Sequence, residues 1–370
     1  MHERIPRGFA TAAPMRSTEA MNGAATRTRI AICVPVRDEF DSLPALLDAF
    51  SKQTAARDCF VVCLLFDGCL DGGQTYADAR APLLDYTLVS ERIERQTVAN
   101  AGRARRAAMA LGTRTLAETR RGGDIELLLC TDADSVPATD WVETSIHALK
   151  HADVVAGYIE RPDAPPSDMH RRVERYWERL RCLQRTVDPL GHDPAPSHPS
   201  QGGANLGFRA DVYAALGGFD DVATHEDVRL VTAARAAGYR VRHDRSVRVA
   251  TSSRVHGRAV DGLADTLRAR QSTRAMPAVQ NPDAALARYR LCAQARAAFD
   301  GLADAATART LAERSGRSVA ELRAIAGECA SAESFVMQLV REPENTEELA
   351  LDSAEQRLAQ LETAHGCPTA

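Results

Sequence analysis

Two acidic motifs in the sequence have residue types and a spacing that could do chemistry. The first, Asp132-Ala-Asp134, follows the apolar run 127–131, and two carboxylates at i and i+2 beyond a strand can face one hard cation. The second, His225-Glu226-Asp227, opens a predicted helix, where a carboxylate in a partly dry cleft can take a proton from an incoming hydroxyl. Each motif alone also fits a structural role, as a capped turn or as an ordinary acidic helix start.

The elements that must position these carboxylates can be predicted from the hydrophobic pattern. Short apolar runs predict buried strands at 29–36, 60–66, 86–89, 125–131 and 153–158, and helical spacing occurs at 42–53, 100–116 and 141–150. This alternation predicts a mostly parallel sheet with helices on both faces, in which ligands bind beyond the carboxyl ends of the strands. The acidic turns 37–39, 67–71 and 132–134 all follow strands, so we expect them to converge on one edge.

The second half of the chain changes character near residue 270. Up to there we expect a helix at 170–187, a loop at 188–199, a Gly-rich segment at 200–208, helices at 211–216 and 226–237, and one or two strands at 239–250. The rest is strand-poor and rich in Ala, Glu, Arg and Leu, with helical patterns at 283–300, 304–314, 318–342 and 346–364. We therefore predict a disordered tail at 1–28, an α/β domain at 29–270 and a helical C-terminal extension at 271–370.

Composition narrows the class of protein. The 370 residues are 45% hydrophobic and 26% charged, which is typical of a soluble globular protein. A net charge of −4 and 5% aromatic residues disfavour nucleic-acid binding. No apolar run approaches the roughly 18–20 residues of a membrane span, and the first 29 residues hold no signal-like apolar run. The nine cysteines form no zinc pattern and read as reduced thiols, so we expect a cytoplasmic protein without an integral membrane segment.

Arginine replaces lysine almost everywhere. Lys52 and Lys150 are the only lysines, which leaves 44 of the 46 basic residues as arginine. A compositional bias of the source genome is one explanation. The other is that some arginines hold phosphates by bidentate contacts, which lysine makes poorly.

Taken in order, the motifs resemble those of the family 2 glycosyltransferases, which have the GT-A fold. Residues 34–39 (VPVRDE) look like the opening strand-turn motif of that family, and 66–72 (FDGCLDG) like its second acidic turn. Residues 100–109 (NAGRARRAAM) are similar to its Asn-x-Gly helix start, and 131–135 (TDADS) match its Asp-x-Asp motif. Residues 203–213, 217–220 and 226–230 match its acceptor-side block. Each motif alone is unspecific. The resemblance rests on their occurring together, in the family's order, over residues 29–258.

The resemblance implies a role for each matching position. The nucleotide pocket would be lined by Pro35 and Glu39, with the backbone of Val36, and Asp67 would contact the base or ribose. Arg103 would approach the donor, Asp132 the ribose, and Asp134 the metal on the diphosphate. Acceptor-side contacts and catalysis would then come from the later motifs: Gly203, Ala204 and Asn205 border the sugar and acceptor, Asp227 is the catalytic base, and Glu226 contacts hydroxyls or shares the role of base.

The segment after residue 249 carries a further expectation. It places a histidine between two arginines, in the sequence VATSSRVHGR. By resemblance to metal-dependent GT-A enzymes, His256 would complete the metal shell, and Arg254 or Arg258 would clamp the diphosphate. A solvated basic loop is the structural alternative.

The function implied is transfer of a sugar from a nucleotide-diphosphate donor to an acceptor hydroxyl, with inversion and with Mg²⁺ or Mn²⁺ as cofactor. Two departures from the family pattern bear on nucleotide choice: Phe66 stands where an aspartate is usual, and Arg37-Asp38 replaces the usual variable residue and asparagine. A nucleotidyltransferase or pyrophosphorylase is an alternative, disfavoured because the first turn has no glycines. A non-catalytic nucleotide-sugar-binding protein is another. The C-terminal helices could cover the acceptor site, form a homodimer or bind a partner.

Overall fold

The computed structural model describes residues 27–118, 122–162, 168–251, 277–340 and 347–367. The tail predicted at 1–28 lies outside these residues except for its last two. The predicted boundary near residue 270 also lies outside them, as do Arg254, His256 and Arg258.

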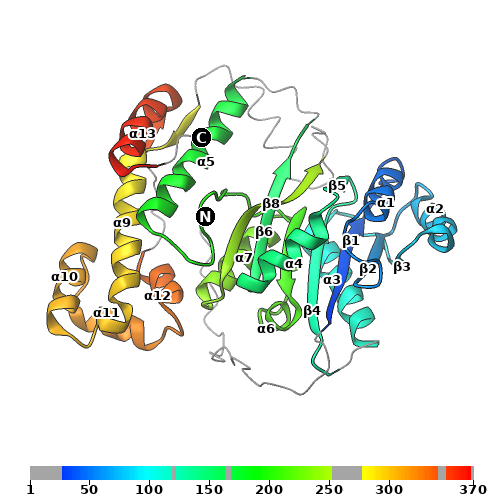
Figure 1. The fold of residues 1–370 in the computed structure, drawn as a ribbon, viewed down its shortest axis with the longest axis horizontal. Coiled ribbons are helices and arrows are strands. Elements are labelled where there is room, and N and C mark those ends of the chain that lie inside the picture. Colours follow the sequence, from blue (N-terminus) through cyan, green and yellow to red (C-terminus); the bar gives the residue numbers. More distant parts are fainter. Residues whose placement is uncertain (1–26, 119–121, 163–167, 252–276, 341–346, 368–370) are drawn as a thin grey trace.

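An eight-stranded mixed sheet forms the centre of the α/β part (Figure 1). Its order is β3-β2-β1-β4-β7-β6-β8-β5, and the neighbours β3-β2, β2-β1, β1-β4 and β6-β8 run parallel. Its strands are β1 Thr28–Val36, β2 Phe60–Asp67, β3 Thr87–Ile93, β4 Ile125–Thr131, β5 Ser135–Pro137, β6 Val154–Glu160, β7 Asn205–Arg209 and β8 Val241–Thr251. The predicted mostly parallel sheet with flanking helices is confirmed, and the arrangement is consistent with a GT-A-type fold.

Helices cover both faces of this sheet, because each buried strand points alternate side chains to opposite sides. One face packs against α1 and α4, and the other against α3, α6 and α7. The helices of this part, with one short 3-10 turn, are α1 Leu43–Ser51, α2 Gly73–Arg80, η1 Ala81–Leu83, α3 Ala101–Glu118, α4 Trp141–His151, α5 Asp168–Val187, α6 Ala210–Ala215 and α7 Glu226–Ala236.

Strand β7 departs from the alternation expected from the sequence. It lies antiparallel between β4 and β6, in the middle of the sheet. Its sequence falls in the Gly-rich segment, which gave no strand signal, because glycine lowers strand propensity. Gly207 packs closely on β4, since a Cβ at this position would lie 2.9 Å from Leu129 Cδ2.

The C-terminal part is helical, as predicted, with an added two-stranded sheet of β9 and β10. It packs on the α/β part through α5, whose apolar side shares a core with α9 and α13. A second core joins α9 to α10, α11 and α12. The helical pattern at 318–342 is divided into α11 and α12. Bounds are β9 Ala278–Gln280, α9 Pro282–Ala298, η2 Phe299–Gly301, α10 Ala305–Ser315, α11 Val319–Gly327, α12 Ala332–Leu339, β10 Glu348–Ala350 and α13 Leu351–His365.

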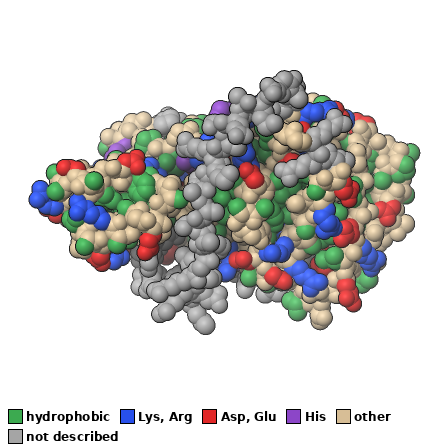
Figure 2. Space-filling model, turned by 90° about the horizontal axis from the view of Figure 1, so that it is seen from below, with side chains coloured by type: hydrophobic (Ala, Val, Ile, Leu, Met, Phe, Trp, Pro, Cys, Tyr) green, Lys and Arg blue, Asp and Glu red, His purple; other side chains and the backbone are tan. Residues whose placement is uncertain are grey.

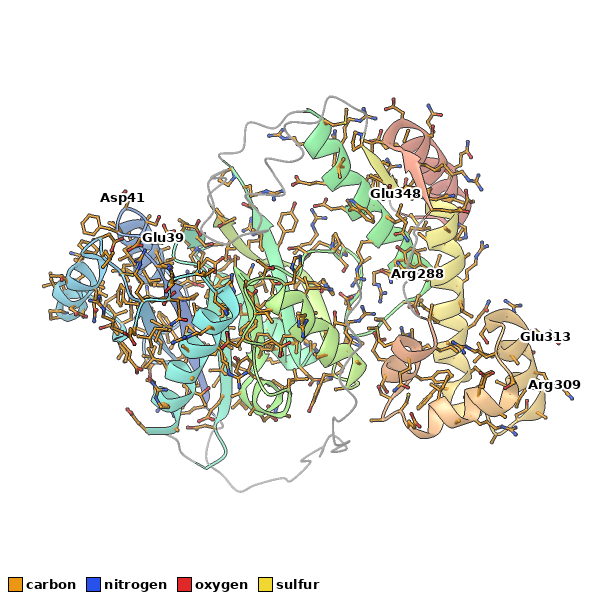
Figure 3. All side chains as sticks on the ribbon, turned by 180° about the vertical axis from the view of Figure 1, so that it is seen from behind. Glu39, Asp41, Arg288, Arg309, Glu313 and Glu348 are labelled. Carbon is orange, nitrogen blue, oxygen red and sulfur yellow. The ribbon has the colours of Figure 1, made fainter. Side chains whose placement is uncertain are left out.

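The two parts lie side by side, and the predicted site lies in the α/β part. Figure 3 shows Glu39 and Asp41 at one end of the molecule and Arg309 and Glu313 of α10 at the other. Figure 2 shows acidic and basic side chains interspersed on the described surface that it presents. This mixture differs from the basic stripe expected of a nucleic-acid-binding face.

Candidate functional site

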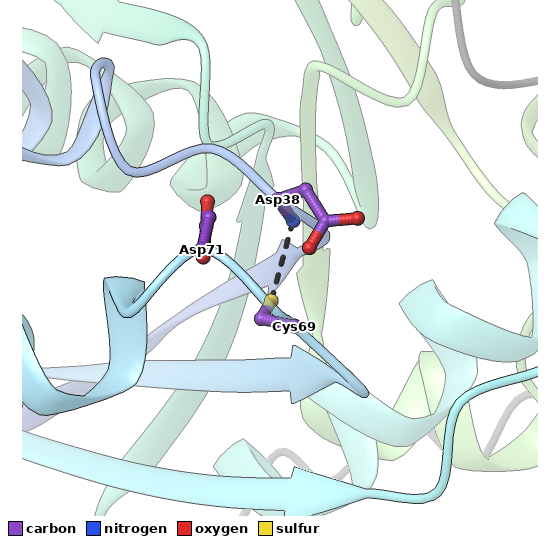
Figure 4. Close-up of side chains that lie close together, drawn as sticks. All are labelled: Asp38, Cys69 and Asp71. Carbon is purple, nitrogen blue, oxygen red and sulfur yellow. Dashed lines mark hydrogen bonds between the residues drawn. The ribbon is translucent and has the colours of Figure 1, made fainter.

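The loops after β1 and β2 are tied together by reciprocal hydrogen bonds, and Figure 4 shows Asp38, Cys69 and Asp71 with the Asp38–Cys69 bond that lies between them. Asp38 accepts from Leu70 N–H (2.8 Å), while Asp71 accepts from Phe40 N–H (2.7 Å). Between them Asp38 N–H donates to Cys69 Sγ (3.3 Å). Asp38 has φ 51°, a left-handed conformation that aspartate tolerates better than most residues. The predicted convergence of the first two acidic turns is thus confirmed.

The same three residues could hold a metal ion, since ligand atoms of Asp38, Cys69 and Asp71 lie within 4.8 Å of one another. Their existing bonds favour a structural clasp instead. Both Asp71 oxygens accept backbone N–H groups, and Asp38 also accepts from Arg95 Nη1 (2.8 Å). Burial raises the pKa of the Cys69 thiol, which keeps it protonated and a poor ligand.

Asp67, at the end of β2, is a buried carboxylate held by an arginine of the preceding turn. The residue is 2% exposed, and Oδ2 accepts from Arg37 Nη1 at 2.8 Å. Oδ1 has no hydrogen-bond partner among the described residues. A buried acceptor left unpaired is costly unless something else donates to it. Asp67 Oδ1 therefore has the capacity to accept a further hydrogen bond.

The other predicted nucleotide-side residues lie at the end of β1 and in the turn that follows it. Pro35 is half-buried, and the Val36 carbonyl accepts from Cys69 Sγ at 3.2 Å. Glu39 Oε2 accepts from Ser42 Oγ at 3.0 Å, just before α1. Their contacts with a nucleotide stay a prediction.

Arg105 joins the two acidic motifs, 132–134 and 225–227. It projects from the second turn of α3 and donates to Asp132 Oδ1 at 2.5 Å and to Glu226 Oε1 at 2.7 Å. Burial opposes its charge, but the carboxylates of Asp132 and Glu226 outweigh that cost and raise the pKa of Arg105 well above its usual value. A permanent cation therefore holds two acidic motifs that are 94 residues apart.

The predicted donor contact is Arg103, not Arg105. Asn100 Oδ1 caps the start of α3 by accepting from the backbone N–H of Arg103 (2.9 Å), and no described carboxylate forms an ion pair with the Arg103 guanidinium. The sequence offers no signal that separates Arg105 from the neighbouring Arg103 and Arg106, because its two carboxylate partners are distant in the chain. The structure shows that the start of α3 packs closely on the 220–222 loop, where a Cβ on Gly102 would lie 2.1 Å from Asp220 O.

Helix α7 carries Glu226 and Asp227 in different surroundings. Glu226 is 3% exposed and faces Arg105. Asp227 is half-buried, and its two oxygens accept one backbone N–H each, from Gly203 (2.7 Å) and Val228 (2.7 Å). Each oxygen has a second lone pair, so Asp227 keeps capacity to accept a further proton donor.

Gly203 lies where only a glycine fits. A Cβ on it would lie 2.4 Å from Arg105 Cζ, so any side chain would push the guanidinium away. Its N–H holds Asp227 while its Cα borders Arg105. Gly203 therefore brings helix α7 and Arg105 together.

Asn205 bonds only to protein groups in the described structure. It donates to Tyr158 O and Val247 O (2.9 Å each), and its Oδ1 accepts from Trp141 Nε1 at 2.9 Å. It is 1% exposed. The two amide protons connect β7 with β6 and β8, and the oxygen connects it with α4, while the predicted ligand contact of Asn205 stays a prediction.

Asp134 lies at the end of the sheet beside the last described residue of β8. Thr251 Oγ1 donates to Asp134 Oδ1 at 3.4 Å and accepts from Ser135 Oγ at 3.0 Å. A half-buried carboxylate of this kind suits Mg²⁺ or Mn²⁺, which often take one or two protein carboxylates and complete their shell with substrate phosphates. The predicted partner His256 follows five residues after Thr251, outside the described residues.

A buried polar cluster supports the segment 188–204, which contains Gly203. Asp193, 1% exposed, accepts from Arg181 Nη2 (2.6 Å), His243 N–H (2.9 Å) and Ser197 Oγ (3.2 Å). His198 is fully buried between the rings of Tyr158 and His243, and neither ring nitrogen has a described partner. Nothing in the sequence linked these residues, because they come from α5, a loop and β8.

This cluster predicts acid sensitivity. Burial lowers the pKa of His198 to about 3 and that of His243 to about 4, with positively charged neighbours such as Arg181 adding to both shifts. The unfolded chain binds these protons near pH 6.5, so it holds more protons than the folded protein between about pH 6.5 and 4. The contribution of the two neutral histidines to stability is fully present above pH 6.5 and is lost as the pH falls. We expect the free energy of unfolding to fall by on the order of 2–5 kcal/mol from pH 7 to 4.5.

Urea denaturation at a series of pH values measures this effect. His198→Gln should flatten the dependence, while His147→Gln, at an exposed position on α4, should keep the wild-type slope. A urea midpoint that is constant from pH 7 to 4.5 in the wild-type protein would contradict the prediction.

Comparisons with known proteins give likenesses of structure. The mannosyltransferase PcManGT from Pyrobaculum calidifontis, in complex with GDP-Man and Mn²⁺, is similar with 17% identity and a TM-score of 0.45, over 94% of this chain and 77% of that chain. TarS 1-349 from S. aureus, in complex with UDP-GlcNAc, is similar with 12% identity and a TM-score of 0.46. The match covers 84% of this chain and 90% of that chain. At these values the likeness does not assign an activity.

Sequence comparison adds no family assignment. No family model matches the chain. No curated protein matches it either. Among the described residues, no helix combines the length and apolar character needed to cross a bilayer.

Proposed function

We propose that this protein is a metal-dependent inverting glycosyltransferase of the family 2 type, which moves a sugar from a nucleotide-diphosphate donor to an acceptor hydroxyl. The observation that carries the proposal is one constellation at the carboxyl edge of the sheet. A buried unpaired acceptor on Asp67 lies on one side, Arg105 and Asp132 lie at the centre, and Asp227 lies on the other. Binding and proton-accepting groups thus share one site, as a group-transfer reaction requires.

On the donor side, Asp67 Oδ1 would accept a hydrogen bond from an N–H of the base or a ribose hydroxyl. Pro35, Val36 and Glu39 would line the same pocket, with Asp132 toward the ribose and Arg103 toward the diphosphate. Arg103 supports this role because its guanidinium has no described carboxylate partner and is therefore available to an anion. Arg254 and Arg258 are proposed as additional diphosphate contacts.

A divalent cation would be held by Asp134, with His256 as a further proposed ligand. When bound, Mg²⁺ or Mn²⁺ would neutralise negative charge on the departing diphosphate. Asp132 is less suited to the ion than Asp134, because Arg105 already occupies its carboxylate. This division of roles agrees with the assignment of Asp132 to the ribose.

On the acceptor side, Asp227 is the base that we favour over Glu226. Glu226 is buried and its carboxylate is bound by Arg105, whereas Asp227 is half-buried and retains free lone pairs. The acceptor oxygen forms a bond to the anomeric carbon while the bond from that carbon to the diphosphate oxygen breaks. The hydroxyl proton passes to the Asp227 carboxylate, and a single displacement inverts the anomeric configuration.

A donor screen tests this proposal. The purified protein is incubated with Mn²⁺ and each common nucleotide sugar, including GDP-Man and UDP-GlcNAc, and release of the nucleoside diphosphate is measured. We expect slow hydrolysis of one donor and thermal stabilisation by its nucleotide, both lost in Asp134→Ala. Asp48→Ala is the matched control, since Asp48 is an exposed aspartate on α1 outside the predicted site.

The alternatives give different results in the same screen. Pyrophosphate release from a nucleoside triphosphate with a sugar phosphate would indicate a nucleotidyltransferase. Donor binding without turnover, unaffected by any acceptor, would indicate a binding protein. Absence of stabilisation by every nucleotide, with and without metal, would contradict the proposal.

A further inference from the structure

A buried ionic network connects the C-terminal helices to the α/β part. Glu333, at the start of α12, accepts from Arg235 Nε of α7 at 3.0 Å and from Arg296 Nη1 of α9. Arg296 also donates to both oxygens of Asp188, at 3.1 and 3.2 Å. Glu333 is 7% exposed and Asp188 is 2% exposed, so water screens these charges little.

The network reaches both elements that form the hydrogen bond between Gly203 and Asp227. Arg235 lies in the last turn of α7, the helix whose first turn carries Asp227. Asp188 begins the segment 188–204, whose penultimate residue, Gly203, donates its N–H to Asp227. Arg185 extends the chain of charges along this segment, lying 3.9 Å from both Asp188 and Asp193.

Close packing accompanies these ion pairs. Helix α12 lies against α7, and a Cβ on Gly238, just after α7, would lie 2.5 Å from Ser331 Oγ. Burial alone would raise the pKa of Glu333, but Arg235 and Arg296 outweigh it and keep the carboxyl ionised. A buried carboxylate that accepts from two arginines has a strongly preferred geometry, because moving it away from either arginine loses a charge-assisted hydrogen bond.

We propose that the C-terminal helices position the acceptor side of the site, and that the Arg235–Glu333–Arg296–Asp188 network fixes α7 relative to segment 188–204. Arg235, Glu333 and Arg296 are positioning residues: they act through the Gly203–Asp227 hydrogen bond and touch no reacting atom. The expected effect on sugar transfer rests on the proposed function, whereas the expected effect on the Gly203–Asp227 hydrogen bond does not.

Hydrogen exchange measures that geometry without any substrate. Arg235→Gln cuts the link to α7 while Arg296 still neutralises Glu333. We expect the amides of Gly203 and Val228, both held by the Asp227 carboxylate, to exchange about tenfold faster, the effect of losing a charged hydrogen bond. The matched control is Arg357→Gln, which removes an exposed arginine–aspartate pair with Asp283 inside the C-terminal part.

The activity readout separates positioning from general stability. With the donor found in the screen, Arg235→Gln should lower kcat about tenfold and leave the KM for donor unchanged, and Arg235→Lys should restore part of kcat. Glu333→Asp is the second variant, which keeps the charge but shortens the arm, and it should also speed exchange at Gly203. Thermal melts establish that each variant is folded.

Two results would overturn the inference. One is wild-type exchange at Gly203 and Val228 in folded Arg235→Gln and Glu333→Asp. The other is an equal acceleration in Arg357→Gln, which would reveal only general loosening. A wild-type protein that turns over no donor contradicts the proposed function instead, and it leaves the exchange result readable.

Discussion

Replacing Arg105 with glutamine is expected to lower the free energy of unfolding by about 3–5 kcal/mol, the cost of removing one partner from a buried ion pair. The side chain is 11% exposed and pairs with two carboxylates, Asp132 and Glu226. Without it these two acidic groups repel each other across the site, with Glu226 almost fully buried. We expect sugar transfer to be lost as well, because the ribose-side and acceptor-side groups are no longer held together.

Chemical denaturation and donor turnover measure the two effects. Arg105→Lys should recover only part of the stability, since one ammonium group cannot reproduce the fork that reaches both carboxylates. Arg103→Gln, two residues earlier on α3, is the control for stability and should unfold near the wild-type midpoint, because no described carboxylate pairs with Arg103. An Arg105→Gln protein as stable as the wild type would show that the ion pairs of Arg105 with Asp132 and Glu226 contribute little to stability.

The arginine-rich composition acquires a structural explanation from these contacts. Arg296 uses three nitrogens to hold Asp188 and Glu333, and Arg105 uses its fork for Asp132 while Nε reaches Glu226. A lysine ammonium cannot span such paired acceptors in fixed directions. Part of the bias toward arginine therefore serves ion pairs within the protein, and phosphate contact remains a proposal for Arg103, Arg254 and Arg258.

The sequence predicted those features whose signals are local. Apolar runs followed by acidic turns predicted β1, β2 and β4, and parallel strands must bring their carboxyl ends to one edge. Strand β7 was not predicted, because Gly207 and the Gly-rich segment around it weaken the pattern that indicates a strand. The Glu333 network could not be predicted, since Asp188, Arg235, Arg296 and Glu333 are brought together only by tertiary packing.

Asp227→Asn is expected to reduce kcat by about 10²–10⁴-fold, the usual contribution of a positioned general base, with little change in donor affinity. The asparagine keeps one oxygen to accept from Gly203 or Val228, so most of the local structure should persist. Its amide cannot take the acceptor proton. Turnover at saturating donor and acceptor, together with donor binding by calorimetry, separates the two quantities.

Glu226→Gln is the comparison that distinguishes the two neighbouring acids. Because Glu226 faces Arg105 and is 3% exposed, its loss should mainly lower stability, with a smaller fall in kcat. The expected pattern is thus a catalytic defect at 227 and a folding defect at 226. The reverse pattern, with Asp227→Asn near wild-type kcat and folded Glu226→Gln inactive, would transfer the role of base to Glu226. In that case Glu226 Oε2, the oxygen that Arg105 does not contact, would accept the proton while Arg105 still holds Oε1.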